Sequence, residues 1–169
     1  MTGKTFNYFT DGAATMKKEN GEYVRCAGGW GWALLDETGE NIVAEDSGGL
    51  KSTTNNEMEL MAIREALLHA CRNAKQCDVV YIHSDSAYCI SIFTQWIKLW
   101  QVNGWTRGRK HEPIENLELI KEIWDIVTYS LENSFIGVRW VKVKGHSTNK
   151  FNNYVDNLAV TAKMSQANA

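Results

Sequence analysis

The order of strand-like and helix-like segments is the feature of this sequence that most constrains its fold. Residues 5–12 alternate apolar and polar side chains like a half-buried strand, and residues 28–50 read as two strands joined at a turn near 38–40. Beyond them the pattern predicts a helix over 54–72, a strand over 78–84, helices over 86–102 and 116–132, a strand over 135–143 and a helix over 152–164. Strands that alternate with helices join a sheet in parallel. The sequence therefore predicts an α/β fold with a mixed five-stranded sheet, three antiparallel strands plus two parallel additions, flanked by helices.

Length and composition predict one globular domain over 1–169, with its core over about 5–164. The 169 residues are 44% hydrophobic and 22% charged, which is enough for one good core. No stretch approaches the roughly 20 apolar residues of a membrane span, and the N-terminal residues lack the apolar core of a signal peptide. We therefore expect no membrane partner and a cytoplasmic location.

The cysteines and the net charge exclude further classes of protein. Cys26, Cys71, Cys77 and Cys89 form no CxxC pair and lie in strand-like or helix-like runs, which predicts buried free thiols rather than disulfides or a zinc site. The net charge of −2 gives no overall attraction to nucleic acid. A nucleic-acid partner would have to be held by a local patch or by metal ions.

The helix predicted over 54–72 carries two glutamates with different surroundings. Steps of three and four residues from Glu59 reach only apolar side chains, namely Ala62, Ile63, Ala66, Leu67 and Ala70. Glu57 points the other way, toward Arg64, and Thr54-x-x-Glu57 is a capping box that explains it structurally. A carboxylate that faces a core is costly unless it is paired or binds a metal. Glu59 therefore needs either a salt bridge at the helix start or a metal.

Three aspartates lie where they could meet Glu59. Asp11 closes the first strand, Asp85 closes the strand over 78–84, and Asp156 lies on the last helix beside apolar residues. Each has a structural explanation when taken alone, as a turn pair, a helix cap and a solvated helix face respectively. Together, acids at two neighbouring strand ends would share one crevice. Four converging acids repel one another unless divalent cations neutralise them, and oxygen ligands suit Mg²⁺ or Mn²⁺.

Six short strings give the chain a family resemblance. They are FTDGA, TTNNEMELMA, HSDSAY, QWIKLWQVNGW, WVKVKGHS and NYVDNLA. In order and approximate spacing they resemble type 1 ribonuclease H, from Phe6 to about Ala162. The resemblance implies the ribonuclease H fold and metal-dependent endonucleolytic hydrolysis of the RNA strand of RNA–DNA hybrids, which leaves 5′-phosphate and 3′-hydroxyl ends.

The resemblance also implies the catalytic residues. Asp11, Glu59, Asp85 and Asp156 match the four family acids, which would hold two Mg²⁺ ions, with Mn²⁺ as a substitute, about 4 Å apart at the scissile phosphate. In the family pattern Asp11 bridges the ions, Asp156 serves the nucleophile side, and Glu59 with Asp85 serves the leaving-group side. His146 matches a mobile-loop histidine that assists proton transfer or product release.

The contacts with substrate that the resemblance implies form three groups. They are Asn55 and Asn56 in the minor groove, Thr54 and Asn116 at a phosphate of the DNA strand, and Tyr88 with Trp100 in an aromatic channel that admits a deoxyribose backbone. Each has a rival structural role, such as helix capping by Thr54 or a helix start at Asn116. For Trp96 and Trp105, aromatic residues at helical spacing favour packing in the core.

The remaining segments bear on the partners. Residues 96–113 or so match a protruding handle with several cations, and we expect no separate hybrid-binding domain before the first strand. The long segment over about 13–29 lacks the family string that would assign its contacts. We expect a monomeric enzyme that acts on RNA–DNA hybrids. Two alternatives stay open: a catalytically weak hybrid-binding module, which has no need of four repelling acids, and a transposase- or integrase-like nuclease core.

Overall fold

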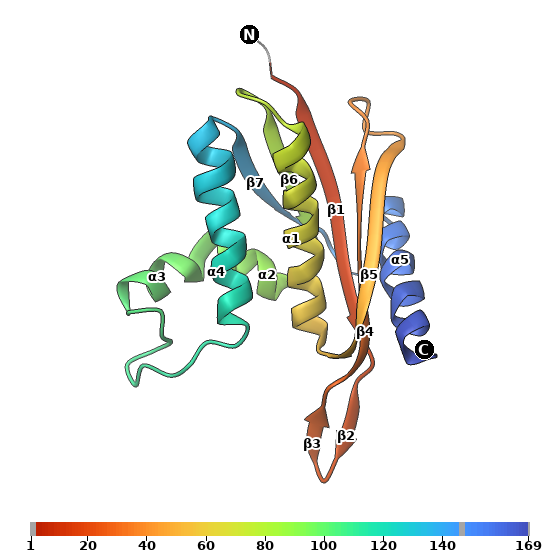
Figure 1. Cartoon of the computed structure of the whole chain (residues 1–169), viewed down its shortest axis with the longest axis vertical. Coiled ribbons are helices and arrows are strands. Elements are labelled where there is room, and N and C mark those ends of the chain that lie inside the picture. Colours follow the sequence, from red (N-terminus) through yellow and green to blue (C-terminus); the bar gives the residue numbers. More distant parts are fainter. Residues whose placement is uncertain (1–2, 146–147, 169) are drawn as a thin grey trace.

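The computed structural model describes residues 3–145 and 148–168, and its centre is a mixed five-stranded sheet (Figure 1). The strands are β1 (Thr5–Ala14), β4 (Cys26–Leu35), β5 (Ile42–Thr53), β6 (Val79–Ser84) and β7 (Gly137–Lys142), in the spatial order β5-β4-β1-β6-β7. β4 is antiparallel to both β1 and β5, whereas β6 is parallel to both β1 and β7. The predicted mixed sheet is confirmed.

Helices cover both faces of the sheet, because successive strand residues alternate between two apolar cores. α1 (Asn55–Asn73) and α4 (Leu117–Asp125) lie on one side and α5 (Lys150–Ala167) on the other (Figure 1). In β4, Trp32 and Leu34 belong to the core beneath α1, while Ala33 and Leu35 belong to the core beneath α5. α4 continues through η2 (Ile126–Leu131), a π-helical turn, and η3 (Glu132–Ser134), a 3₁₀ turn. The central strands are thereby fixed between two packed layers.

The segment between β1 and β4 folds into a hairpin that the sequence analysis did not predict. β2 (Lys17–Glu19) pairs antiparallel with β3 (Glu22–Val24), and the hairpin projects beyond the main sheet (Figure 1). Asn20 and Gly21 both have positive φ, 53° and 81°, as a two-residue type I′ turn requires. The Asn-Gly pair is the sequence signal for this turn. The flanking strands are short and charged, so they show no apolar alternation.

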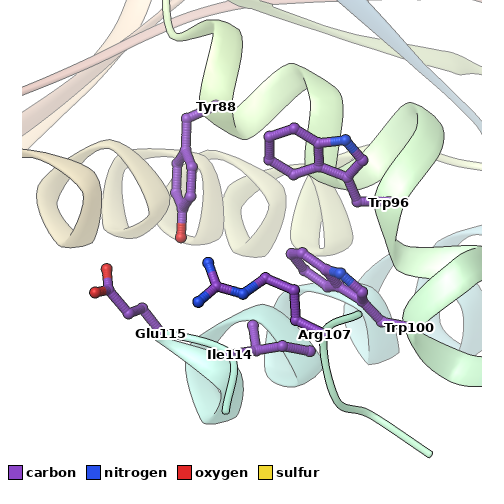
Figure 2. Close-up of a pocket in the computed structure, with 6 residues that line it drawn as sticks. All are labelled: Tyr88, Trp96, Trp100, Arg107, Ile114 and Glu115. Atoms are coloured by element: carbon purple, nitrogen blue, oxygen red, sulfur yellow. The ribbon is translucent and has the colours of Figure 1, made fainter. Parts of the chain in front are cut away.

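The helical stretch after β6 contains a π-helical turn that changes which side chains share a face. Its parts are α2 (Ala87–Ser91), the π turn η1 (Ile92–Trp96) and α3 (Ile97–Val102). A π turn holds an extra residue, so side chains beyond it are rotated by about 100° relative to a regular helix. Tyr88, Trp96 and Trp100 consequently line one hollow (Figure 2). Trp96 is 36% exposed, so the prediction that it packs in the core is wrong, whereas Trp105 packs against the core as expected.

The cysteines are free, as predicted, but most of them are not buried. Cys89 is buried, Cys26 is half-buried, and Cys71 and Cys77 are exposed. The prediction of buried thiols is wrong for the last two, because Cys71 lies at the exposed end of α1 and Cys77 lies in the turn before β6, with φ 78°. Over 3–145 and 148–168, no helix is long and apolar enough to cross a membrane.

Candidate active site

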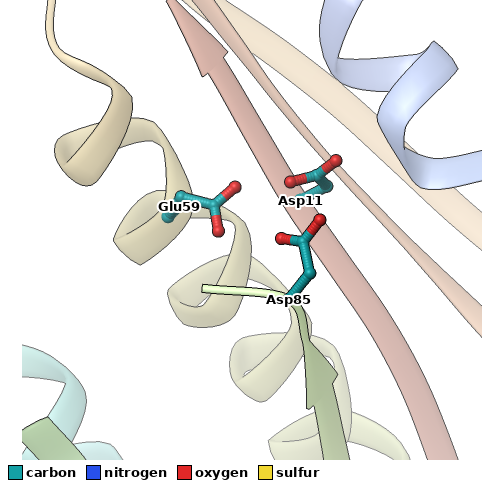
Figure 3. A group of neighbouring side chains, drawn as sticks. All are labelled: Asp11, Glu59 and Asp85. Carbon is teal, nitrogen blue, oxygen red and sulfur yellow. The ribbon is translucent and has the colours of Figure 1, made fainter. Parts of the chain in front are cut away.

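Three carboxylates gather where the parallel part of the sheet ends (Figure 3). The pairing of β1 with β6 stops at Thr10 and Ser84, and the next residues are Asp11 and Asp85. Glu59 faces them from the start of α1. One oxygen from each carboxylate lies within 4.8 Å of the other two. The crevice expected at the strand ends therefore brings together three of the four predicted acids.

Gly12 brings strand and helix into contact beside these acids. A Cβ at this position would lie 2.3 Å from the backbone nitrogen of Glu59 and 2.4 Å from the carbonyl carbon of Met58. The Gly12 N–H donates to Asp11 Oδ1 at 2.9 Å and also to Glu59 Oε1. Glycine alone permits this approach, so Gly12 sets the spacing between the acid on the strand and the acid on the helix.

The prediction that Asp11 closes its strand is wrong. β1 continues to Ala14 in antiparallel pairing with β4, so the Asp-Gly pair lies inside a strand and not in a turn. The parallel pairing with β6 ends before Asp11, while the antiparallel pairing carries on past it. Asp11 is thus held by regular sheet structure on one side and open to the crevice on the other.

Burial without a compensating cation governs the pKa values of the cluster. Burial raises the pKa of Asp11 to about 7, and the charge of Asp85 adds to the effect. Burial likewise raises the pKa of Glu59 well above its usual range, and its hydrogen bond with Asp11 adds to this. Among the residues that the structure describes, no ion pair includes these carboxylates. Without a cation these carboxyls therefore favour the protonated form, and a bound divalent cation would favour the ionised form.

The capping explanation for Asp85 is excluded by its neighbour Ser86, whereas the exposed position of Asp156 on α5 remains compatible with a solvated helix face. Ser86, and not Asp85, caps α2, since its Oγ accepts a hydrogen bond from Cys89 N at 3.1 Å. Asp85 stays half-buried and turns toward the cluster (Figure 3). Asp156 is exposed on α5, and its effect on the cluster is to raise the pKa of Asp11 further. His146, the remaining predicted catalytic residue, lies outside the described residues.

The start of α1 assigns separate roles to its polar residues. Thr54 is the N-cap, and its Oγ1 accepts a hydrogen bond from Glu57 N at 3.2 Å. The Glu57 carboxylate accepts from Arg25 at 2.8 Å and from the hydroxyl of Thr53. The expected orientation toward Arg64 is therefore wrong, because Arg64 pairs with two other glutamates at 3.3 and 3.4 Å. Only the threonine half of the capping box is seen in this part of the structure.

Asn55 ties the helix start to the end of β1. Its Oδ1 accepts a hydrogen bond from Ala14 N at 2.6 Å, which leaves its Nδ2 as a donor. Asn55, Asn56 and Thr54 line a hollow of about 430 Å³ between the hairpin and α1. Asn55 and Glu59 are four residues apart and share one helix face. The residues predicted for the minor groove therefore lie next to the acid cluster.

A second hollow, of about 420 Å³, contains the predicted aromatic channel (Figure 2). Its lining residues are Tyr88, Trp96, Trp100, Arg107, Ile114 and Glu115. Arg107 enters from the handle loop and forms an ion pair with Glu112 at 3.5 Å. Asn116, at the start of α4, donates a long hydrogen bond of 3.4 Å to the Tyr88 hydroxyl.

The two hollows adjoin, since Glu115 lines both. The predicted pair Tyr88 and Trp100 comes together in the second hollow. Arg107 lies within the predicted handle, and no sequence pattern indicated its place in this hollow. The path of the handle loop, which a sequence pattern does not reveal, decides that position.

Comparisons with known proteins agree with the fold and the acid cluster described above. Residues 3–164 match the family model described as RNase H. A ribonuclease H of Acetivibrio thermocellus is 37% identical over 157 residues, 92% of each chain, and a ribonuclease H of Chlorobaculum parvum is 39% identical over 168 residues, 97% of this chain and 99% of that one. The solved structure of LC9-RNase H1, a type 1 RNase H with the type 2 active-site motif, matches with a TM-score of 0.75 at 28% identity, over 98% of this chain and 75% of that chain. This chain therefore belongs to the RNase H family.

Proposed function

We infer that this protein is an endonuclease that hydrolyses the RNA strand of RNA–DNA hybrids and leaves 5′-phosphate and 3′-hydroxyl ends. The observation that carries this inference is the cluster of Asp11, Glu59 and Asp85 at the strand ends of a ribonuclease H fold, with Asp156 adjoining it. Membership of the RNase H family supports the same reaction, since relatives named ribonuclease H match almost the whole chain.

The acid cluster fits divalent cations. It offers only carboxylate oxygens, which are hard ligands suited to Mg²⁺ or Mn²⁺. The ion pairs of the described residues leave these carboxylates without a protein cation. We propose that Asp11, Glu59, Asp85 and Asp156 hold two Mg²⁺ ions, which when bound would activate the attacking water and stabilise the leaving 3′ oxygen.

The chain itself orients the acids before any substrate arrives. The Gly12 N–H donates to both Asp11 and Glu59, so the two carboxylates are held in one arrangement. Asp85 from the end of β6 and Asp156 from α5 add acid groups from two further elements. His146 is proposed to assist proton transfer or product release, the role implied by the resemblance.

Selection of the hybrid is proposed to begin at the start of α1. The Asn55 amide is oriented by Ala14, so its Nδ2 is presented as a donor. The minor groove offers acceptors on base edges and the 2′-hydroxyl of the RNA strand, which such a donor can contact. Asn55 lies one helical turn from Glu59, so a strand held there passes close to the acids.

The DNA strand is proposed to run along the aromatic hollow and past Thr54. Thr54 and Asn116 would contact one of its phosphates, and Tyr88 with Trp100 would pack against its deoxyribose backbone. Glu115 lines both hollows, so Thr54 lies beside the aromatic hollow, which supports this path. Aromatic side chains beside a backbone path are the usual means of holding a single strand without reading its sequence.

One assay tests the proposed function. The protein is incubated with Mg²⁺ and a labelled RNA–DNA hybrid, duplex DNA or duplex RNA. We expect cleavage of the RNA strand of the hybrid alone, with the stated ends, and no cleavage by Asp85→Asn, which has nearly the same shape without the charge. Binding without cleavage would instead indicate a hybrid-binding module, and joined products would indicate a strand-transfer nuclease.

We also propose that residues 1–169 act as one catalytic unit, as a monomer in the cytoplasm. The family match over 3–164 supports the single unit. Sedimentation over a range of protein concentrations tests the monomer, which should keep one mass throughout.

A further inference from the structure

The β2–β3 hairpin forms one side of the hollow that holds Asn55 and Asn56, yet no function assigned above uses it. The hollow is lined by Tyr23 of the hairpin and by Met16, directly before β2, which are 64% and 63% exposed. Large apolar side chains that stay exposed at the rim of a hollow are available to a ligand. The hairpin also projects past the sheet, at the end where α1 begins (Figure 1).

The hairpin separates its charges between its two faces. Lys18 and Tyr23 are paired across the strands and so share a face, and Lys18 Nζ lies 4.8 Å from the centre of the Tyr23 ring. Lys17 lies on the opposite face, where it forms an ion pair with Glu19 at 3.4 Å. Glu22 pairs with Glu19 across the strands on that same face. The face with Tyr23 therefore carries an aromatic ring and a lysine, and both glutamates lie on the other face.

The base of the hairpin is tied to the start of α1. Arg25, directly after β3, donates to Glu57 Oε1 at 2.8 Å and to the Ser52 carbonyl at 3.1 Å. Asn55 is bonded at the same place to the end of β1. The hairpin is thus held in a fixed relation to Asn55, and a strand that contacts Asn55 and Asn56 passes beside Tyr23.

We propose that the β2–β3 hairpin is a wall of the substrate groove, in which Tyr23 packs on sugars of the strand that contacts Asn55 and Asn56, and Lys18 neutralises a phosphate of that strand. The proposal rests on the proposed function, because its occupant is the RNA–DNA hybrid. A face of one ring and one cation complements a sugar–phosphate backbone. The hollow is also continuous with Asn55, one helical turn from Glu59, so the occupant of the acid site reaches the hairpin.

Two neighbouring lysines provide a matched test. Lys18→Gln and Lys17→Gln remove the same charge from opposite faces of the hairpin. Equilibrium binding of the hybrid is measured over a range of salt concentrations, in a chelator that prevents cleavage. Lys18→Gln should reduce the slope of log affinity against log salt by about 0.9, the value for one phosphate contact, and Lys17→Gln should leave it unchanged. Equal slopes for the two variants would overturn the proposal.

Tyr23→Ala should raise KM for the hybrid roughly five- to tenfold with kcat nearly unchanged, as expected for a lost stacking contact. Tyr23→Phe should keep the parent KM. Tyr129→Ala is the control, since Tyr129 is 73% exposed on η2, and melting curves verify that each variant is folded. If the parent cuts the hybrid but Tyr23→Ala behaves like Tyr129→Ala, the hairpin proposal alone is wrong. If the parent cuts no hybrid, the proposed function fails and the hairpin proposal fails with it.

Discussion

The two ends of the β1–β6 strand pair hold buried carboxylates in opposite ways. At the end where β6 begins, Asp78 accepts hydrogen bonds from the backbone nitrogens of Lys4 at 2.8 Å and Lys75 at 2.7 Å. Burial acts to raise its pKa, but these donors outweigh burial and the pKa lies below its usual value. At the other end, burial raises the pKa of both Asp11 and Glu59.

The number of donors for each carboxylate explains the difference. Asp78 has two backbone donors of its own, so its charge is satisfied by the fold. Asp11 and Glu59 share the single N–H of Gly12 and face a third acid, Asp85. The first arrangement stabilises the protein, and the second is the kind that marks a functional site. Substitutions at both ends and addition of Mg²⁺ test this contrast.

The largest effect should follow from removing one acid of the cluster. Asp85→Asn should lower cleavage of the hybrid by orders of magnitude, because a proposed metal ligand is lost. Its melting temperature in a chelator should stay level or rise, because repulsion within the cluster falls. Steady-state cleavage and thermal melting measure the two effects. Cleavage within a few-fold of the parent would remove Asp85 from the active site.

The satisfied carboxylate should respond in the reverse way. Asp78→Ala should lower the free energy of unfolding by roughly 1–3 kcal/mol, because two backbone N–H groups lose their acceptor, and should leave kcat unchanged. The folded-state pKa of Asp78 is lowered, so its contribution is fully present above the ordinary value of about 3.9 and is lost as pH falls through the folded value. Denaturant unfolding at neutral and acid pH should show the gap between parent and variant narrowing in acid. If Asp78→Ala kept the stability of the parent but cleaved the hybrid poorly, Asp78 would belong to the functional site and not to the structural framework.

A divalent cation should stabilise the folded protein by binding only at the acid cluster. At tenfold excess over its Kd, one bound Mg²⁺ adds about 1.4 kcal/mol to the free energy of unfolding. The parent and Asp78→Ala should both melt at a higher temperature in Mg²⁺ than in chelator, by the same increment. Asp11→Asn should show a smaller increment. An undiminished increment in Asp11→Asn would mean that Mg²⁺ binds elsewhere.

The smallest change in stability is expected at Glu57, and its comparison with Glu59 separates the two glutamates of α1. Glu57→Ala should cost about 1 kcal/mol, because the helix start loses its contacts with Arg25 and Thr53, and kcat should be nearly unchanged. Glu59→Gln should instead keep the stability and lose cleavage. Melting curves and turnover on both variants decide the matter, and equal losses of turnover would contradict the separate roles.

Local patterns explain what the sequence could predict. The hydrophobic pattern of neighbouring residues indicates the order of strands and helices, and this order was enough to predict the mixed sheet. The lone acid on an apolar helix face singled out Glu59, which the structure places beside Asp11 and Asp85. Tyr88 and Trp100 also line one hollow, although their roles stay predictions.

The predictions that were wrong, and the hairpin that was not predicted, concern features that the spacing of neighbouring residues does not indicate. The π turn of η1 breaks the 3.6-residue period from which the position of Trp96 was inferred. The ion pair of Glu57 joins residues 32 positions apart, so no helical spacing reveals it. The β2–β3 hairpin has charged strands, and only its Asn-Gly turn gives a signal. Backbone irregularity and contacts between distant segments account for the differences.

The contact between Gly12 and α1 limits how this site can vary. Aspartate and glutamate differ by one methylene, so a carboxylate in the cluster has a near substitute, and side-chain rotation can absorb part of the change. Gly12 has no near substitute, because even the methyl group of alanine would lie 2.3 Å from a backbone nitrogen, and strand and helix would have to separate. The position in this site that tolerates the least change therefore carries no reactive group, and a search of the sequence for catalytic side chains passes over it.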